Sequence, residues 1–411
     1  MSIIFPFSLC ADLMNIALKN VSGTTTTTDG ATSDGLICTE DLSNFVQCGV
    51  AVNTGVDVKM FINTFTSMLE HCGKTYFETL SAEKVKERFN LRVSSDEFAV
   101  LSQKVRINPE TFEAAFVMDG TQSSSFDDLF GKHPFTFNVK IWNCNGFYRT
   151  KPFTISYEMF KSSVLSSAAW RELVAEMWKV VDAVVEIALT QSPRFLVEQQ
   201  IANAALYRSG VRVVSLPQLY ASETGGTFTS EDDPDFAAWF VAWQRHVNEV
   251  MEEPTNLYSG KATIKINTPA TYKRKFLIDR FYDSINKGLS GVYHDDKIGN
   301  IDDYELIPYL ENVNEPRKLD IVPANPPVLT TGKKVTRVQF GNVVGAIWDK
   351  RGTFYSINYR KIGQNPNEFD DHVNYISTVG ASHCVDEDSN IVVFTMNTSG
   401  TDYTITEETD E

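Results

Sequence analysis

The feature that most limits the fold of this chain is an apolar stripe of helical period that begins near residue 167. The stripe residues recur mostly at steps of three or four, as on one face of an α-helix. They are Trp170, Leu173, Val174, Met177, Trp178, Val181, Val184, Val185, Ala188 and Leu189. From residue 167 to 189 such a helix is about 35 Å long. Pro193 is expected to kink it before it resumes over residues 195–206, and Gly210 to end it. A helix of this length with one apolar stripe requires a broad sheet or another helix beneath it.

Beyond this helix, strand and helix patterns alternate up to about residue 320. Residues 211–216 have the pattern of a strand. Asp233 followed by Pro234 is the N-cap and first-turn pattern that opens a helix. A strand over residues 275–279 then leads into a short helix. The alternation predicts a mixed α/β unit, and the proline-rich segment 322–327 marks its end.

The C-terminal part of the sequence is dominated by strand patterns. The five segments are residues 335–340, 343–348, 353–359, 372–379 and 391–396. Residues 349–352 are expected to close a hairpin, and residues 386–390 to form another polar turn. We therefore expect one antiparallel sheet in this part of the chain.

The N-terminal part predicts an extension followed by a projecting hairpin. The first 40 residues offer little for a core, because the Thr/Gly run at 23–30 cannot bury enough surface to order itself. After it, an amphipathic helix is predicted from apolar residues at helical spacing. These are Phe61, Phe65 and Met68. Two extended segments, 105–107 and 135–139, are separated by polar residues and predict the hairpin.

The chain is acidic, with 37 Lys+Arg against 53 Asp+Glu and a formal net charge of −16. This balance argues against a protein whose main task is to bind nucleic-acid phosphates through clustered cations. Residues 362–411 hold eleven carboxylates and no Lys or Arg. Hydrophobic residues make up 42% of the chain, which permits a sizeable core. No segment has the about 20 consecutive apolar residues of a membrane span, so we expect a cytosolic chain without a membrane partner.

The sequence predicts no catalytic, cofactor-binding or metal-binding residues, and hence no enzyme. The six cysteines and six histidines are dispersed without metal-ligand spacing, so we expect reduced thiols. Ser81 and Lys84 match a Ser-x-x-Lys pattern, but a charged helix face explains them better. His294 and the carboxylates around Asp302 have ligand types that suit a divalent cation, but a solvated loop is the better explanation. The glycine-rich patterns that bind nucleotide phosphates are absent.

Three stretches of the sequence resemble a known family. They are FVQCGV at 45–50 with FINTF at 61–65, NGFY at 145–148 with MFKSSV at 159–164, and VGAIWDKRG at 344–352 with IVVF at 391–394. Together with the order of elements, these stretches resemble the major capsid (head) proteins of tailed double-stranded DNA bacteriophages. Within that family they look most similar to the head proteins of small short-tailed phages of the Bacillus podovirus type. The resemblance extends over residues 44–396 and contains no single diagnostic motif.

The resemblance implies an α+β fold, the tailed-phage major capsid fold or Johnson fold. This fold has an N-terminal arm, an extended loop, a peripheral domain with a long spine helix, and an axial domain. The implied boundaries are 1–60 for the N-terminal arm, 61–150 for the extended loop with its projecting hairpin, 151–212 for the peripheral domain with the spine helix, 213–328 for the axial domain, 329–398 for the return sheet of the peripheral domain, and 399–411 for an acidic C-terminal tail.

The function implied by the resemblance is that of a structural virion protein. Such a protein self-assembles into the pentamers and hexamers of an icosahedral head, which encloses the DNA genome without sequence-specific binding and without a cofactor. The expected location is the virion, after assembly in the host cytoplasm. A scaffolding protein and a portal are the expected partners, and the scaffold is expected to be separate because the chain has no long charged helical N-terminal extension.

Charged residues are the candidates for contacts between subunits. Asp370 and Asp371, or the acidic tail, are expected to meet Lys or Arg of neighbouring copies. The basic patch formed by Lys273, Arg274 and Lys275 is better explained as a solvated face or a subunit contact than as a phosphate-binding track. Two alternatives stay open at this point: another virion assembly protein, such as a tail or ring protein, and a soluble enzyme whose site is built by residues distant in sequence.

Overall fold

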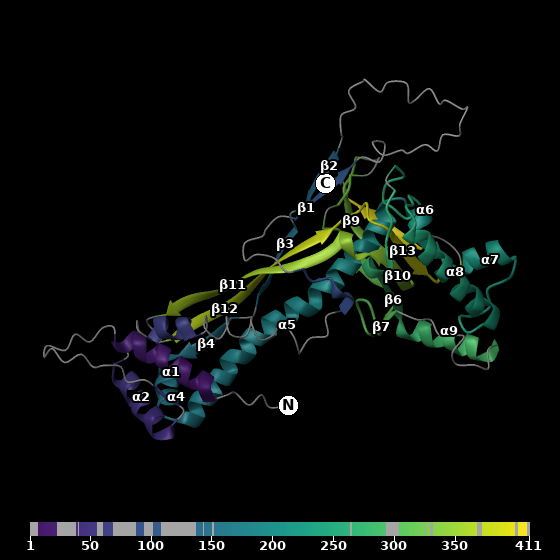
Figure 1. The fold of residues 1–411 in the computed structure, drawn as a ribbon. Coiled ribbons are helices and arrows are strands. Elements are labelled where there is room, and N and C mark those ends of the chain that lie inside the picture. The colour runs from purple at the N-terminus through teal and green to yellow at the C-terminus, as the bar shows by residue number, and fades with distance from the viewer. Residues whose placement is uncertain are drawn as a thin grey trace, which may run out of the picture.

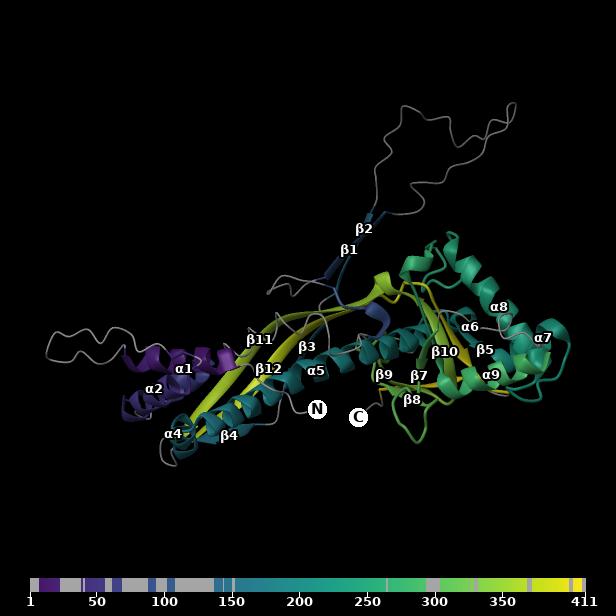
Figure 2. The ribbon, with the colours of Figure 1, turned by 60° about the horizontal axis from the view of Figure 1, so that its bottom comes forward.

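The computed structural model is elongated, with a long helix and a long β-ribbon side by side and a helix-covered sheet at one end (Figures 1 and 2). It contains helices and several separate sheets, so the expected α+β class is confirmed. The described residues are 7–22, 38–39, 41–55, 61–68, 88–93, 102–107, 137–142, 144–149, 152–263, 265–292, 304–324, 326–328, 332–367, 372–398 and 402–408.

The long helix α5 (Ser167–Leu206) has 40 residues, and at 1.5 Å per residue it is about 60 Å long. Pro193 lies inside it and does not end it. Much of the apolar stripe is buried, as the sequence predicts: Trp170, Leu173, Val174, Met177, Val184, Val185, Ala188 and Leu189. The predicted stop at Gly210 is wrong, because Gly210 lies in the next helix, α6 (Ser209–Arg212). Arg208 instead takes the left-handed conformation (φ 55°, ψ 45°) that turns the chain.

The β-ribbon consists of β11 (Thr353–Asn367) and β12 (His372–Val385), which pair antiparallel along their whole length. On its other edge β12 pairs with β3 (Cys144–Arg149) and then with β4 (Phe153–Ser156). Helix α5 packs along this sheet and supplies the helical layer that its apolar stripe requires (Figure 1).

Helices of the N-terminal part gather at the end of α5 where β4 lies (Figure 1). They are α1 (Phe7–Ser22), α2 (Leu42–Gly55), the helical residues 61–68 and α4 (Tyr157–Val164). The rings of Phe61 and Phe160 are 5.0 Å apart, and Trp170 donates its Nε1–H to the carbonyl of Cys10 at 3.2 Å. The expectation that the first 40 residues contribute little to a core is therefore wrong for residues 7–22, whereas the Thr/Gly run lies outside the described residues.

The second large sheet has five strands in the order β5-β13-β10-β6-β7. Their bounds are β5 (Val213–Ser215), β13 (Ile391–Thr395), β10 (Val343–Asp349), β6 (Lys273–Ile278) and β7 (Glu305–Ile307). The pairs β5–β13 and β6–β7 are parallel and the others antiparallel. Every residue of β10 and β13 is buried, as in strands covered on both faces.

Helices α7 (Leu216–Thr224), α8 (Pro234–Glu252) and α9 (Asp279–Val292) lie beside this sheet (Figure 2). The predicted cap is confirmed, because the Asp233 carboxylate accepts from the N–H of Asp235 at 3.0 Å. The strand predicted over residues 211–216 is shorter and covers only Val213–Ser215. Helix α6 ends directly before it, and α7 begins directly after it, with Pro217 in the first turn of α7.

A third, small sheet has the order β14-β9-β8. Its strands are β14 (Tyr403–Glu407), β9 (Val335–Phe340) and β8 (Leu319–Ile321). The five predicted C-terminal strands are all present, but the prediction of one antiparallel sheet is wrong, because they are shared among three sheets. The predicted hairpin at residues 349–352 is also wrong: a 3₁₀ turn, Lys350–Gly352, carries the chain from β10 in one sheet to β11 in another.

A two-stranded hairpin projects away from the ribbon (Figure 2). It consists of β1 (Ser102–Ile107) and β2 (Phe137–Trp142), which pair from Ser102 opposite Trp142 to Ile107 opposite Phe137. The two predicted strands of the hairpin are thereby confirmed, and the polar residues between them lie outside the described residues. Within the described part of the chain no third strand joins this pair.

Candidate functional site

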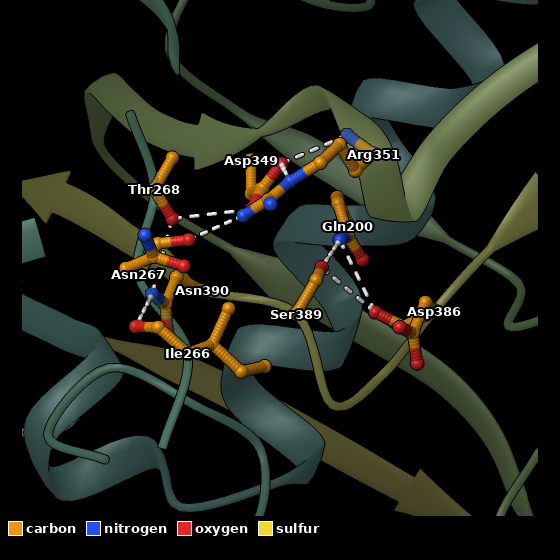
Figure 3. Close-up of polar contacts among 9 residues, drawn as sticks. All are labelled: Gln200, Ile266, Asn267, Thr268, Asp349, Arg351, Asp386, Ser389 and Asn390. Atoms are coloured by element: carbon orange, nitrogen blue, oxygen red, sulfur yellow. Dashed lines mark hydrogen bonds and ion pairs between the residues drawn. The ribbon is translucent and has the colours of Figure 1, made fainter. Parts of the chain in front are cut away.

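A buried polar cluster joins the two large sheets to α5 (Figure 3). Its centre is the segment between β12 and β13, residues 386–390, which we call the β12–β13 turn. The predicted polar turn is present, but it is not solvated: Asp386 and Asn390 are 0% exposed, and Asp388 and Ser389 are nearly so. Polar groups removed from water need partners inside the protein, so this turn has to be held by its surroundings.

The C-terminal part of α5 and the helix after it supply several of these partners. Gln200 donates from Nε2 to Ser389 Oγ at 2.5 Å and to the carbonyl of Asp386 at 3.3 Å (Figure 3). Arg212 donates from Nη2 to the carbonyl of Ser389 at 2.9 Å, and from Nη1 to the carbonyls of Asn203 and Tyr207, both at 3.1 Å. The end of the long helix and the β12–β13 turn are therefore fixed to each other.

Arg212 is also the buried counter-charge of this acidic turn. Its side chain is fully buried, and this burial lowers the pKa of Arg212 to about 10, although the nearby Asp388 and Asp386 carboxylates favour the charged form. The guanidinium therefore stays positive at neutral pH. Lys261 adds a second, more exposed cation, with Nζ 3.6 Å from Asp388 Oδ2.

The end of β10 closes the cluster on the side of the five-stranded sheet. Asp349 accepts from Arg351 Nε at 3.0 Å and from Thr268 Oγ1 at 3.2 Å, and its hydrogen bond with Arg351 raises the pKa of that guanidinium (Figure 3). Asn390 donates from Nδ2 to Thr268 Oγ1 at 3.1 Å. A Cβ on Gly352 would lie 2.5 Å from the Cβ of Ser389, so only glycine fits there. The cluster thus fixes the corner where the chain crosses from one sheet to the other.

A second buried polar group lies beside Pro193 of α5. The Tyr148 hydroxyl is 2.9 Å from Ser192 Oγ, and Nε2 of His383 is 3.0 Å from the same oxygen. Burial lowers the pKa of His383 to about 4, so the imidazole is neutral at pH 7. A serine beside a histidine suggests a nucleophile, but Ser192 is fully buried and has no access for a substrate. These side chains join α5 to β3 and β12, and their role is structural.

Within the described residues, no group of three or more His, Cys, Asp or Glu side chains is placed to hold a metal ion. Among the described cysteines, Cys10, Cys38 and Cys48 are free and buried, and Cys384 is buried as well. None of the described helices is long and apolar enough to cross a membrane.

The three predicted contact residues of β6 all interact within their own chain. Lys273 is buried and donates from Nζ to Glu252 Oε1 at 2.8 Å. Arg274 donates from Nε to the carbonyl of Phe89 at 2.6 Å. Lys275 Nζ lies 5.6 Å from the centre of the Tyr304 ring. The three line one cavity of about 480 Å³, so the structure brings them together.

The acidic contact candidates are only partly within the described residues. Asp370 and Asp371 lie outside them, between the end of β11 and the start of β12. Glu407 is the last residue of β14, and the N–H of Glu408 donates to the carbonyl of Lys334 at 2.9 Å. The Ser-x-x-Lys pattern at Ser81 and the His294 loop also lie outside the described residues.

Comparison with known proteins gives similarity at the level of structure only. No protein-family model matches the sequence, and no curated protein matches it. Among solved structures, 78 chains match. The chain is similar to one in the capsid structure of Staphylococcus phage Andhra, with 13% identity over 77% of this chain and 86% of that chain and a TM-score of 0.46. It is also similar to a chain in the structure of the head fibre and inner core protein gp22 of bacteriophage P68, with 12% identity, coverage of 77% and 88%, and a TM-score of 0.45.

A more distant match comes from the crystal structure of a virus-like particle from Pyrococcus furiosus. It shows 9% identity over 79% of this chain and 95% of that chain, with a TM-score of 0.31. At such identities and TM-scores the matches do not assign a function, which has to be inferred from the chain's own architecture.

Proposed function

We propose that this chain is the major capsid protein of a tailed double-stranded DNA phage. It is a structural, non-enzymatic virion protein that self-assembles into the pentamers and hexamers of an icosahedral head. The observation that carries this proposal is the elongated frame. A helix of 40 residues lies along a thin β-ribbon, and a hairpin projects from that ribbon with no third strand among the described residues (Figures 1 and 2).

The projecting hairpin supports assembly because a hairpin of this kind is marginal in isolation. Each of its strands has six residues. A two-stranded ribbon without a third strand or a packed helix is barely stable in water, and its free edges invite pairing with other chains. In a closed shell, a neighbouring copy covers such a surface in every subunit. The hairpin therefore suits a protein that completes its fold in an assembly.

The charge of the chain is also consistent with a shell around DNA. With a formal net charge of −16, it is unsuited to tight binding of the genome. We propose that the head encloses the DNA without sequence-specific contacts. The buried cluster of Figure 3 would fix the angle between the two large sheets, so that every subunit presents the same contact surfaces.

Several finer features belong to this proposal. They are the Bacillus podovirus type of head protein, the six domain boundaries given above, a separate scaffolding protein and a portal as partners, and assembly in the host cytoplasm. We further propose that Asp370 and Asp371, at the connection between β11 and β12, meet cations of neighbouring subunits. We also propose that the patch of Lys273, Arg274 and Lys275 is a contact between subunits.

The direct test is electron microscopy with light scattering of the protein expressed alone, and then with a candidate scaffolding protein. Closed isometric shells, or pentamers and hexamers, are expected. Tubes or rings would favour the alternative of a tail or ring protein. A monodisperse monomer or dimer under both conditions would contradict the proposal and favour a soluble enzyme.

The contact role of the β11–β12 connection has its own test. Reversing both charges, Asp370→Lys with Asp371→Lys, should reduce the yield of shells while the isolated subunit keeps its stability. Normal shells in normal yield from this variant would show that the connection is not a charged contact.

A further inference from the structure

A cavity of about 340 Å³ lies between α5 and the end of β7 with the residues that follow it. Its apolar wall comes from Leu189, Pro193 and Val197 on α5 and from Ile307 and Leu310 opposite. Charged side chains line it as well, two arginines and one glutamate. A concave apolar surface with a few charged groups is the usual form of a ligand-binding site.

The cavity is lined by two arginines, Arg88 and Arg194. Arg88 is exposed, and Arg194 lies against the ring of Tyr309, with Cζ 4.9 Å from the ring centre. In the described part of the chain neither forms an ion pair. Two guanidinium groups against the single carboxyl group of Glu198, beside an apolar wall, favour an anionic ligand, and a carboxylate suits the geometry of their N–H groups.

Arg88 is held at this position by its neighbour. Phe89 has a left-handed backbone (φ 65°), its N–H donates to Glu305 Oε2 at 2.8 Å, and its carbonyl accepts from Arg274 Nε at 2.6 Å. Its ring is buried 5.1 Å from that of Trp348. A non-glycine residue keeps such a conformation only where its surroundings impose it. The backbone from which the Arg88 side chain extends is therefore fixed in place.

Glu198 makes the cavity sensitive to pH. Its carboxyl group forms no hydrogen bond with the described residues. Burial raises the pKa of Glu198 to about 7. Arg194 of the same helix lowers this pKa by a smaller amount, and Glu311 raises it. The other charged or titratable groups lining the cavity are Arg88 and, after β7, Tyr309. Below pH 7 the neutral carboxyl is able to donate its O–H to an incoming carboxylate, whereas above pH 7 its charge opposes that carboxylate.

We propose that this cavity binds a carboxylate side chain from the acidic C-terminal segment, residues 402–411, of a second copy of the chain. That segment carries five carboxylates, on Asp402, Glu407, Glu408, Asp410 and Glu411, and no Lys or Arg. Its strand β14 is an edge strand that ends at Glu407. The choice of a second copy rests on the proposed function, whereas an anion site in the cavity does not depend on it.

The test is fluorescence anisotropy of a labelled peptide, residues 402–411, titrated with the unassembled full-length protein. The affinity is expected to be about tenfold higher at pH 6 than at pH 8, because a group with a pKa of about 7 has to take up a proton for the carboxylate to bind. Glu198→Gln, which mimics the neutral form, should bring this ratio close to one.

Two variants with the same change of charge separate a specific site from general attraction. Arg88→Glu should weaken peptide binding by about tenfold or more. Lys179→Glu, on an exposed part of α5, should leave it unchanged. Equal weakening by both variants, or a pH ratio that Glu198→Gln does not alter, would overturn the site. Shells observed by microscopy together with no peptide binding would leave the proposed function intact and refute only this inference.

Discussion

The two halves of β12 differ in what covers them. In the outer half, from His372 to Thr378, buried and part-exposed residues alternate, whereas in the inner half, from Val379 to Val385, every residue is buried. In the outer half Tyr375 packs against the rings of Phe65 and Phe153, while Ile376 on the opposite face is 36% exposed. In the inner half the strand runs into the polar cluster of Figure 3.

This difference separates contacts made within the chain from contacts left for another molecule. An alternating strand belongs to a sheet with one open face, and a fully buried strand to a sheet covered on both. The inner half therefore defines the shape of the subunit, and the outer half offers a surface. Substitutions in the inner half should affect stability, and those in the outer half should affect assembly.

The largest effect is expected from Arg212→Met. This change removes the hydrogen bonds to Ser389, Asn203 and Tyr207 and takes a buried cation away from the acidic turn. Loss of one partner of a buried ionic group costs about 3–5 kcal/mol. Urea unfolding of the unassembled subunit measures this loss in the free energy of unfolding. Lys179→Met, which removes an exposed i,i+3 pair on α5, should cost less than about 1 kcal/mol. If the two variants were equally stable, Arg212 would have no role as the counter-charge.

The second prediction concerns pH. Burial lowers the pKa of His383 from its usual 6.5 to about 4, so between these values the unfolded chain binds the proton and the folded chain does not. The stability contributed by the neutral imidazole is complete above pH 6.5 and is lost as the pH falls to 4, by about 3 kcal/mol. His383→Gln should flatten this part of the stability profile relative to the parent protein.

Because Glu198 contributes a slope of opposite sign over part of the same range, the comparison has to be made between variant and parent at each pH. A parental slope in His383→Gln would mean that this imidazole is not held neutral by the fold.

The third prediction compares two glycines, Gly352 in the turn before β11 and Gly363 within β11. Gly352→Ala places a methyl group 2.5 Å from the Cβ of Ser389 in the inner region, and overpacking of this kind costs about 1–3 kcal/mol. Gly363→Ala, in the outer half, meets its nearest atom, the carbonyl oxygen of Ile376, only at 3.8 Å. Thermal unfolding should show a loss for the first and no loss for the second. Equal losses would contradict the difference between the two halves.

The sequence predicts well those elements whose pattern is local. The period of the apolar stripe gives α5, and Asp233 with Pro234 gives the start of α8, because cap and stripe depend only on nearby residues. Sheet membership was not predictable in this way. The strands β10 and β11 follow one another along the chain, yet the buried side chain of Asp349 and the turn after it direct them into different sheets.

The candidate site was predictable only in part. The acidic run at residues 386–388 has the composition of a solvated turn, and its burial depends on Arg212 and Gln200, which lie more than 170 positions earlier in the chain. Likewise, Lys273 and its neighbours form a visible basic patch, but their partners Glu252 and Phe89 come from other segments. The charged residues of such a run are visible in the sequence, whereas the residues that pair with them are brought there only by the fold.

The smallest effect on stability, and the largest on assembly, is expected from Ile376→Asp. The side chain is partly exposed on the open face of the outer half, so the unassembled subunit should change by less than about 1 kcal/mol in urea unfolding. If another copy covers this face, a carboxylate there has to be desolvated without a partner, and the concentration needed for shell formation should rise by about tenfold or more. Ile376→Val keeps the apolar surface and should assemble like the parent. Light scattering during assembly distinguishes the two variants, and normal shells from Ile376→Asp would place the contact between copies somewhere other than this face of β12.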